Sequence, residues 1–273
     1  MGNNTPIFHV QNLTKVFHSI RGDTVTDTLA LDKISVDIHD GEFDCLLGPS
    51  GCGKTTLLQI LGGLLEASEG TLEFKGKGIH GPSIERGYIF QRFNLFPWLT
   101  SLENVMFGLK YMQIKPKDRE TIAMEKLSLV GLAGFKDHYP SQLSGGMQQR
   151  VSIARTLAIN PEVYLMDEPF GSLDAQTRSR MQEELVDLWQ ETDLHNKTIV
   201  FVTHDIREAV LLADRIILIT ARPGKVKSKI KIDLERPRDP FDPKYVEHTR
   251  QVFSQMEKEI EIAIKDEMTA KKQ

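Results

Sequence analysis

The sequence has little cysteine. Cys45 and Cys52 are the only two thiols among its 273 residues, and two thiols cannot build a disulfide framework for a chain of this length. The N-terminal stretch MGNNTPIFHV also lacks the basic patch and the apolar run of a secretory signal peptide. These absences exclude the disulfide-rich secreted class, and we expect a reducing, cytoplasmic setting.

Long hydrophobic runs and an excess of one charge are missing as well. The longest apolar segments, such as RIILIT and TLLQILGGLL, are too short or too interrupted to span a bilayer. The 34 Lys and Arg residues stand against 38 Asp and Glu, for a formal net charge of -4. This balance disfavours a protein that coats nucleic acid, and we expect no nucleic-acid partner. A function at a membrane would therefore require a partner that holds the chain there.

What is present is a globular composition in which strand-like and helical patterns alternate. Hydrophobic residues make up 40% of the chain, enough for one large core or two modest ones. The alternation predicts an α/β fold with a mainly parallel sheet covered by helices. The strand-like runs lie at 34–38, 43–47, 87–91, 163–166, 198–202 and 215–220.

Two regions depart from this alternation. Three helical patterns, at 101–112, 117–130 and 144–159, follow one another without a convincing strand, which predicts a helical insert. After the turn Arg222-Pro223-Gly224, KVKSKIKIDL alternates like an edge strand, and the tail from Pro243 predicts an amphipathic helix. This helix could pack on its own domain or form a partner surface. Its apolar positions are Val246, Phe253, Met256, Ile260 and Ile264.

A glycine-rich loop joins the run at 43–47 to a leucine-rich helical pattern at 55–65. Glycines let backbone N–H groups converge on phosphate oxygens, while Lys54 can neutralise β/γ-phosphate charge and Thr55 can ligate Mg²⁺. The strand before and the helix after favour a nucleotide site over a plain turn. Cys52 is either a small spacer or a redox-sensitive thiol. The loop residues, which match G-x-x-x-x-G-K-[ST], are Gly48, Pro49, Ser50, Gly51, Cys52, Gly53, Lys54 and Thr55.

Polar residues close three further strand-like runs. VYLMDEP contains Asp167 and Glu168, whose side chains point to opposite sides of a strand and cannot share one task. Asp167 can belong to the Mg²⁺ shell while Glu168 faces a water as general base, or both acids simply cap a strand. His204 follows TIVFVT, and Gln91 closes GYIFQ as a metal or water ligand, at ends where parallel sheets bind ligands. A structural role is the alternative for each.

The stretch LSGGMQQR is a second helix start that contains glycine. Ser144 is a good N-cap, and Met147, Val151, Ala154 and Ala158 line one face of the helix behind it. A capped helix is the simple explanation. Gly145 and Gly146 could also form a second anion site. A second anion site suggests that a nucleotide is shared between two copies of the chain.

Together these motifs resemble the ATP-binding subunits of ABC transporters, over nearly the whole chain. Walker A (48–55), the Q-loop Gln91, the signature from Leu143, Walker B with its glutamate (163–168), the SLD loop (172–174) and the switch His204 occur in the family's order. The resemblance implies a P-loop NTPase (RecA-like) core, an antiparallel N-terminal β subdomain and an inserted helical subdomain. It predicts an ATPase domain over 1–240, with 1–91 and 160–240 as core and 92–159 as the helical signature subdomain, and a helical tail over 241–273.

The same resemblance implies an ATPase that works as a head-to-tail dimer, with ATP and Mg²⁺ between the Walker A of one subunit and the signature of the other. It assigns catalysis to Glu168 as the base, His204 at the γ-phosphate, Gln91 and Lys54. It assigns the metal to Thr55, Gln91 and Asp167. Asp174 reaches across the dimer or merely caps the helix that follows. The nucleotide contacts by position are Phe17, the eight loop residues, Thr56, Ser144, Gly145, Gly146 and Asp174.

Three features depart from the family pattern or from the expected fold. HSIRGDTVTDT predicts a lengthened loop directly after Phe17, the aromatic that would stack on adenine. Met147 stands where the signature has glutamine, which leaves the helix start intact. Asp44 lies within an expected buried strand, an inconsistency that the sequence does not explain.

The segment QRFNLFPWLTSLENV places several large apolar residues beside Gln91, as core or as an exposed interface. It resembles the groove of ABC importers that receives a coupling helix of the membrane permease. LFPWLTSLENV, FVTHDIREAVLLADRIILITARPGKV and DLERPRDP resemble the nitrate, sulfonate and taurine importers. We therefore expect an importer motor at the cytoplasmic face of the membrane. Its partners would be a second ATPase subunit, identical or homologous, permease subunits and, indirectly, an extracytoplasmic solute-binding protein. An exporter motor and a soluble, non-transport ABC ATPase are the alternatives.

Overall fold

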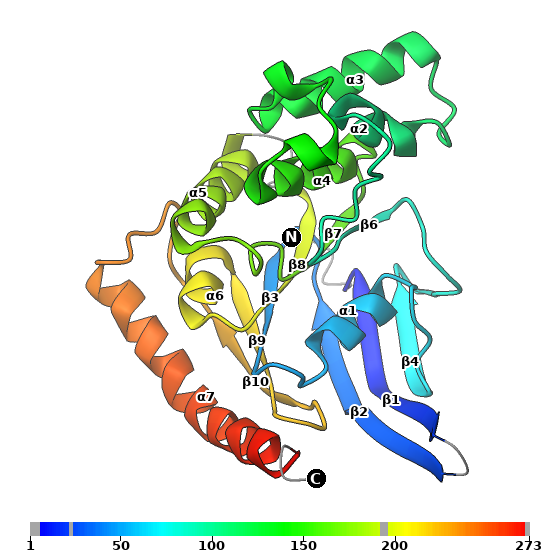
Figure 1. Ribbon diagram of the computed structural model, residues 1–273. Coiled ribbons are helices and arrows are strands. Elements are labelled where there is room, and N and C mark those ends of the chain that lie inside the picture. The colour runs from blue at the N-terminus through cyan, green and yellow to red at the C-terminus, as the bar shows by residue number, and fades with distance from the viewer. Residues whose placement is uncertain (1–5, 22–23, 192–195, 271–273) are drawn as a thin grey trace. The chain divides into compact units, whose positions relative to one another are not determined.

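The computed structural model describes residues 6–21, 24–191 and 196–270. They form two compact units, the first made of the described residues up to 82 and from 196 onward, and the second of those between 83 and 191 (Figure 1). Within the described ranges, none of the helices combines the length and the apolar character that a membrane span requires.

The first unit contains a buried sheet with a parallel centre. β3 (Phe43–Leu47) pairs in parallel with β8 (Thr198–Thr203) and with β9 (Arg215–Ile219). β10 (Val226–Lys231) runs antiparallel to β9 at the edge. Every residue of β3 and β8 is buried, as expected for parallel strands covered on both faces. The predicted parallel core and edge strand are therefore confirmed.

An antiparallel sheet forms the N-terminal part of the same unit. Its strands are ordered β2-β1-β4-β5. Their bounds are β1 Phe8–Arg21, β2 Thr24–Ile38, β4 Glu69–Phe74 and β5 Lys77–Gly78. The lengthened loop predicted after Phe17 is wrong, because β1 and β2 continue there as a long pair, with Phe17 opposite Thr28 and His18 opposite Asp27. The β-branched residues of this stretch favour the extended conformation.

Among its described residues, the first unit also contains the helices α1 (Lys54–Leu61), α6 (Ile206–Leu212) and α7 (Pro243–Ala270). α7 lies beside α6 (Figure 1). Tyr245, Val252 and Met256 of α7 are buried, whereas Phe253 is 51% exposed. The predicted apolar stripe therefore packs on its own unit only in part.

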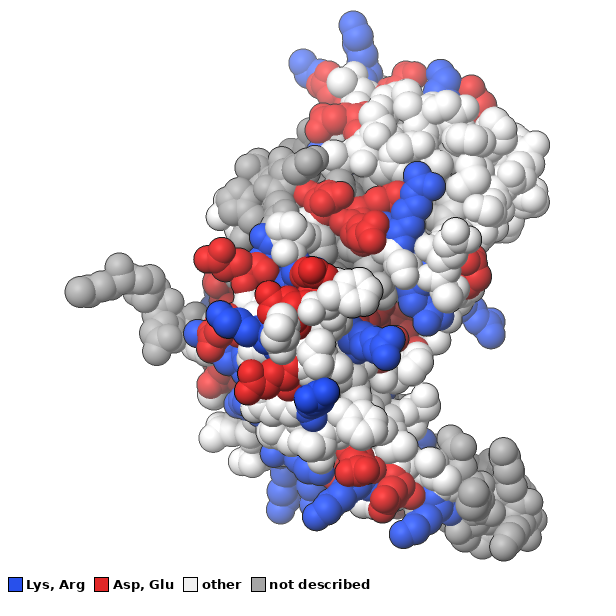
Figure 2. Space-filling model, turned by 90° about the vertical axis from the view of Figure 1, so that its left-hand side faces the viewer, with Lys and Arg blue, Asp and Glu red and all other residues white. Residues whose placement is uncertain are grey.

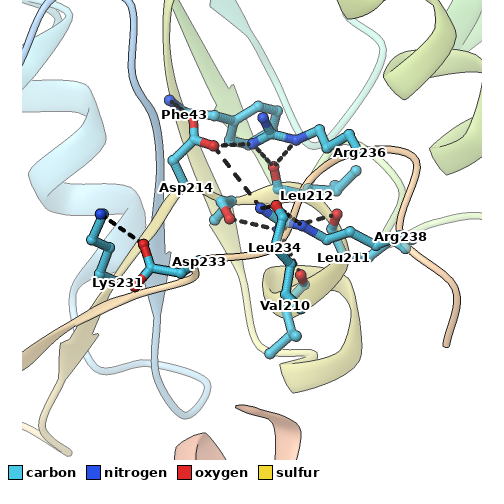
Figure 3. A network of polar contacts seen from close by, with 11 residues as sticks. Phe43, Val210, Leu211, Leu212, Asp214, Lys231, Asp233, Leu234, Arg236 and Arg238 are labelled. Carbon is cyan, nitrogen blue, oxygen red and sulfur yellow. Dashed lines mark hydrogen bonds and ion pairs between the residues drawn. The ribbon is translucent and has the colours of Figure 1, made fainter. Parts of the chain in front are cut away.

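The end of α6 is held by two arginines from the segment between β10 and α7 (Figure 3). The guanidinium of Arg238 donates to the carbonyl oxygens of Val210 and Ala213, both at 2.7 Å. Arg236 donates to the Leu212 carbonyl and pairs with Asp214 at 2.8 Å. The last carbonyls of a helix have no partner within it. The DLERPRDP stretch supplies those partners here.

The second unit contains the predicted helical insert and two parallel strands. β6 (Arg86–Ile89) pairs with β7 (Val163–Asp167). Thr100 and Glu103 form a capping box at the start of α2, which explains where that helix begins. The helices are α2 Ser101–Leu109, α3 Pro116–Leu129, α4 Gly145–Ala158 and α5 Ala175–Glu191, with short 3-10 turns at Ala133–Phe135 and Pro140–Gln142.

Asp44, unexplained by the sequence, has a partner in the neighbouring strand. Arg215 donates to both of its carboxylate oxygens, at 2.6 and 2.7 Å. The side chain of Asp44 is fully buried, and this burial raises the pKa of Asp44 to about 6. Asp44 is thus half of a buried ion pair that joins β3 to β9.

Charged side chains of both signs are mixed over the face drawn in Figure 2. Lys and Arg alternate there with Asp and Glu, and no continuous basic surface is visible among the described residues of this face.

Candidate nucleotide-binding site

The glycine loop leaves the carboxyl end of β3 and enters α1. Gly53 has a φ of 103°, in the left-handed region, and a Cβ added there would lie 2.7 Å from Leu31 and 2.9 Å from the Ala30 carbonyl. At Gly48 a Cβ would come within 2.8 Å of the Ile219 carbonyl oxygen. Only glycine satisfies both the backbone conformation at 53 and the close approach at 48. The motif glycines therefore shape this loop.

Lys54 places a buried cation inside the loop. Its side chain is 4% exposed, and Nζ donates to the carbonyl oxygens of Gly48 at 2.8 Å and Pro49 at 3.0 Å. α1 begins at this lysine without a side-chain cap, so the positive end of the helix dipole faces the loop. A buried ammonium beside an uncapped helix start fits a phosphate group.

Cys52 is also buried in the loop, with 1% of its surface exposed. Its Sγ lies 3.9 Å from Lys54 Nζ. This burial supports the interpretation of Cys52 as a spacer.

Arg222 is a loop contact that the sequence analysis missed. Its guanidinium donates to the Gly51 carbonyl at 3.2 and 3.3 Å. Gly224 packs so closely that a Cβ there would lie 2.3 Å from the Cys52 carbonyl. The signal in the sequence was the turn Arg222-Pro223-Gly224 itself, which we interpreted only as a chain reversal. In the structure, this turn contacts the backbone of the phosphate loop at Gly51 and Cys52.

His204 follows the strand next to the one that carries the phosphate loop. Leu47 at the end of β3 is opposite Thr203 at the end of β8, so Gly48 and His204 leave the same edge of the sheet. Asp205 caps α6 by accepting from the N–H groups of Arg207 at 2.8 Å and Glu208 at 3.3 Å. The structure therefore brings His204 and the phosphate loop together.

The second unit brings the predicted carboxylates and Gln91 together in the same way. Ile89 is opposite Met166, so Gln91 and the Asp167-Glu168 pair follow neighbouring strand ends. Asp167 is 4% exposed, and its Oδ2 accepts a hydrogen bond of 3.2 Å from the Tyr88 hydroxyl. Burial, with the charge of Asp167, raises the pKa of Tyr88 well above its usual range. Tyr88 thus keeps its proton and orients the carboxylate, a role that the sequence alone did not indicate.

Glu168 has an unusual backbone conformation. Its φ is 42°, in the left-handed region that costs a non-glycine residue free energy. Such strain persists where the surrounding structure fixes it, and it concentrates at functional sites. The Gly171 N–H donates to the Glu168 carbonyl at 2.9 Å and closes the turn. The strain therefore supports a functional role for Glu168.

The segment behind Gln91 is attached to α4 and α2. Arg155 of α4 donates to the carbonyls of Asn94 at 2.8 Å and Phe93 at 3.3 Å. The buried Asn104 side chain accepts from the Phe96 N–H at 2.8 Å and donates to the Phe96 and Leu99 carbonyls. Neither Arg155 nor Asn104 was predicted, because these bonds go to backbone atoms and leave no pattern in the sequence.

The signature residues lie at the start of α4. Ser144 is the N-cap, and its hydroxyl accepts from the Met147 N–H at 3.3 Å. Gly145 is exposed, and Gly146 is buried where a Cβ would lie 2.8 Å from Thr177. Asp174 caps α5 by accepting from the N–H groups of Gln176 and Thr177 at 3.1 and 3.0 Å. Ser144 and Asp174 therefore both have the simpler of their predicted roles, which is to cap the start of a helix.

A sequence model described as ABC transporter matches residues 31–171 of this chain. The chain belongs to the ABC transporter family. The ATP-binding proteins of this family are ATPases, so this chain is an ATPase.

Curated relatives extend the similarity over most of the ABC chain. A nitrate import ATP-binding protein of Synechocystis sp. is 45% identical over 86% of this chain and 85% of its own. A taurine import ATP-binding protein of Rhizobium johnstonii is 45% identical over 76% of this chain and 78% of its own. The predicted resemblance to the nitrate and taurine branch is confirmed.

A solved ABC cassette has the same fold. It is a dimeric, post-hydrolysis ATP-binding cassette bound to ADP and phosphate, 36% identical, with a TM-score of 0.70. The match covers 84% of this chain and all of that cassette, 100%. The predicted P-loop NTPase fold is confirmed.

Phe17, predicted to stack on adenine in this ABC ATPase, lies on β1 and is 40% exposed. Lys15 Nζ lies 5.2 Å from its ring centroid. A half-exposed ring fits a stacking surface, and its contact with adenine stays a prediction.

Proposed function

We propose that this ABC ATPase is the motor subunit of an importer, and that ATP binding and hydrolysis in a head-to-tail dimer drive solute uptake through a partner permease. The observation that carries the proposal is the similarity to nitrate and taurine import subunits over most of the chain. The partner permease would hold the motor at the cytoplasmic face of the membrane.

The phosphate loop would hold the nucleotide. Lys54 would move its buried ammonium from loop carbonyls to the β/γ-phosphates, where charge-assisted bonds are stronger. The uncapped start of α1 adds backbone donors. Thr55, Gln91 and Asp167 supply the oxygen ligands that Mg²⁺ prefers, with Tyr88 orienting Asp167. When bound, Mg²⁺ neutralises phosphate charge.

Hydrolysis would use the groups at the strand ends. Glu168, held in its strained conformation, would accept a proton from the attacking water as general base. His204 would contact the γ-phosphate, and its turn is fixed because the Asp205 N–H donates to Thr203 Oγ1 at 3.0 Å. The remaining nucleotide contacts would come from Phe17, Pro49, Ser50, Cys52 and Thr56.

The signature would contact the nucleotide of the other subunit. Ser144, Gly145 and Gly146 stand at the start of a 14-residue helix, where backbone N–H groups and the helix dipole favour an anion. Asp174 would reach the partner subunit in addition to capping α5. The dimeric state of the solved ABC cassette supports this arrangement.

Aromatic rings on the second unit would receive the permease. Phe96 contacts Trp98 and Phe107, with ring centroids 5.7 and 4.3 Å apart, and Phe107 contacts Tyr111 at 5.6 Å. Trp98 is 69% exposed and Tyr111 79%. We call these four residues the aromatic cluster; Phe96 and Trp98 lie on the segment predicted to meet a coupling helix, and Phe107 and Tyr111 follow it in the chain. Exposed aromatic clusters of this kind mark protein interfaces.

The proposal is tested by isolating partners of Glu168→Gln protein with ATP and Mg²⁺ from detergent-solubilised membranes of its own source. We expect a polytopic permease together with an extracytoplasmic binding protein. Trp98→Ser in the same background should lose the permease. Phe241→Ser, which removes a 90% exposed ring outside the aromatic cluster, should retain it.

Other outcomes would contradict the proposal in distinct ways. A permease without any binding protein would indicate an exporter motor. Ribosomal or DNA-bound proteins without a permease would indicate a soluble, non-transport ATPase. The solute, which we propose to be a small nitrate-like, sulfonate-like or taurine-like molecule, would follow from screening the recovered binding protein.

A further inference from the structure

A cavity of about 600 Å³ lies in the first unit between the start of α6 and α7. His204 and Arg207 line it from the β8–α6 side, and Arg250, Phe253, Met256 and Ile260 line it from α7. Ligand pockets have volumes of roughly 300–1,000 Å³. The cavity therefore has the size of a small-molecule site.

One side of the cavity is apolar and comes from α7. Phe253, Met256 and Ile260 are three or four residues apart, so they share one face of the helix. Met256 is buried, while the ring of Phe253 is 51% exposed. When an apolar group covers a large ring that is half exposed to water, the burial of apolar surface is favourable.

Two arginines also line the cavity, Arg207 from the start of α6 and Arg250 from α7. Arg207 and Arg250 are both exposed, and within 6–21, 24–191 and 196–270 neither guanidinium has an ion pair or a hydrogen bond. The acidic residue in the lining, Asp205, uses its Oδ1 to cap α6. The cavity thus combines two available guanidinium groups with an apolar wall.

We propose that this cavity binds a small organic anion with an apolar body. Arg207 and Arg250 would bind its carboxylate, sulfonate or phosphate group, since the guanidinium matches such groups in a bidentate manner. Phe253, Met256 and Ile260 would cover the apolar body. Such a ligand differs chemically from a nucleotide, and its site contains no residue of the phosphate loop.

The site can act on the switch histidine. His204 lines the cavity, and the far end of α6 is held by Arg236 and Arg238. An occupant would therefore press on the end of α6 that carries His204. We expect occupancy to change the rate of ATP hydrolysis, an effect that rests on the proposed role of His204.

Binding is measured by the fluorescence of anilinonaphthalene sulfonate and its displacement by octanesulfonate. We expect one saturable site in the wild type. Octyltrimethylammonium, which has the same chain and the opposite charge, should displace the probe at least tenfold less well. Arg250→Glu should weaken binding at least tenfold, whereas Lys258→Glu, the same charge change on an exposed residue of α7, should not.

The apolar wall has its own matched pair of variants. Phe253→Ser should weaken octanesulfonate binding, and Ile262→Ser, which alters a 44% exposed residue of α7 away from the cavity, should not. Equal affinity in Arg250→Glu and Lys258→Glu, or equal displacement by the cation, would overturn the site. Thermal unfolding of each variant identifies any that fail to fold, and Arg250→Gln then replaces Arg250→Glu.

Two further arms separate the source of the anion from its effect. Sedimentation with phosphatidylglycerol vesicles that depends on Arg250 would identify a lipid headgroup. Octanesulfonate binding without vesicle binding would identify a free anion. Hydrolysis that octanesulfonate leaves unchanged would overturn the coupling through His204 while the binding data still support the site. None of these readings depends on whether the motor serves an importer.

Discussion

One residue, Tyr88, orients the buried carboxylate of Asp167 at the end of β7. The Tyr88 hydroxyl donates to Oδ2 of Asp167 at 3.2 Å. Asp167 is the proposed Mg²⁺ ligand, so Tyr88 is a positioning residue for the metal.

Replacing Tyr88 by Phe removes one donor and keeps the contact of the ring with Phe90, whose centroid is 4.5 Å away. We expect hydrolysis to fall about tenfold at limiting Mg²⁺, in line with the ~10–100-fold cost of losing an outer-shell partner. Saturating Mg²⁺ should restore most of the rate, and ATP binding without metal should be unchanged. Steady-state hydrolysis against Mg²⁺ concentration measures this. A loss that Mg²⁺ cannot rescue would indicate a purely structural tyrosine.

The ion pair of Asp44 with Arg215 is the second residue-scale feature. Removal of one member leaves the other charge buried without a partner, which costs about 3–5 kcal/mol. We expect Arg215→Met alone to lower the free energy of unfolding by about this amount. The double variant Asp44→Leu with Arg215→Met should recover most of it. Denaturant unfolding of the four proteins in this cycle is the measurement, and additive losses would show that the pair is not coupled.

At the scale of elements, α7 is anchored to the β9–β10 turn by one buried carboxylate. Glu259 accepts from the Ala221 N–H at 2.9 Å and pairs with Lys227 at 2.8 Å. Burial alone would raise the pKa of Glu259, but these bonds, with Lys227 first, hold it below its ordinary value of 4.5. A carboxylate whose pKa is lowered by folding stabilises the protein above its unfolded pKa.

The stabilisation from Glu259 should therefore be complete near neutral pH and lost as the pH falls below 4.5 through the folded pKa. We expect Glu259→Gln to be less stable than the wild type by about 1–2 kcal/mol near neutral pH. The difference should shrink on acidification. Thermal unfolding of both proteins over a pH series checks this. A difference that is independent of pH would contradict the assigned ionisation.

The C-terminal end of α6 depends on Arg238. Its guanidinium is buried, and burial lowers the pKa of Arg238 to about 10. Arg238→Met should lower the free energy of unfolding by about 3 kcal/mol, since buried helix carbonyls lose a charged donor. Lys229→Met, at an exposed position of β10, should change it by about 0.5 kcal/mol or less. Similar effects of both variants in denaturant unfolding would refute the role of Arg238.

At the scale of the whole molecule, the proposed dimer depends on the start of α4. Ser144→Arg places a bulky cation where the nucleotide of the other subunit would bind. We expect the monomer to keep its ATP affinity within about twofold, because the phosphate loop is untouched, while the dimer weakens by at least about 1.4 kcal/mol, or tenfold. Light scattering in the Glu168→Gln background with ATP and Mg²⁺ measures this. Ser128→Arg, at an exposed position of α3, is the control, and an undiminished Ser144→Arg dimer would contradict the shared site.

The sequence by itself determined the strand–loop–helix unit at Gly48 to Thr55, the parallel core and the identity of the chemical groups. These follow from local patterns: alternation, glycine spacing and caps such as Ser144 are written in neighbouring residues. The ATPase assignment followed from the order of those motifs.

Only the tertiary structure decided which residues support those groups. Arg215 binds Asp44 although 171 positions separate them in the sequence, and Arg222 contacts Gly51 across the same separation. Tyr88 meets Asp167 only because β6 and β7 are neighbours. The strands that continue past Phe17 likewise depend on pairing between β1 and β2. Contacts between distant segments depend on topology and packing, and they leave no periodic signal in one sequence.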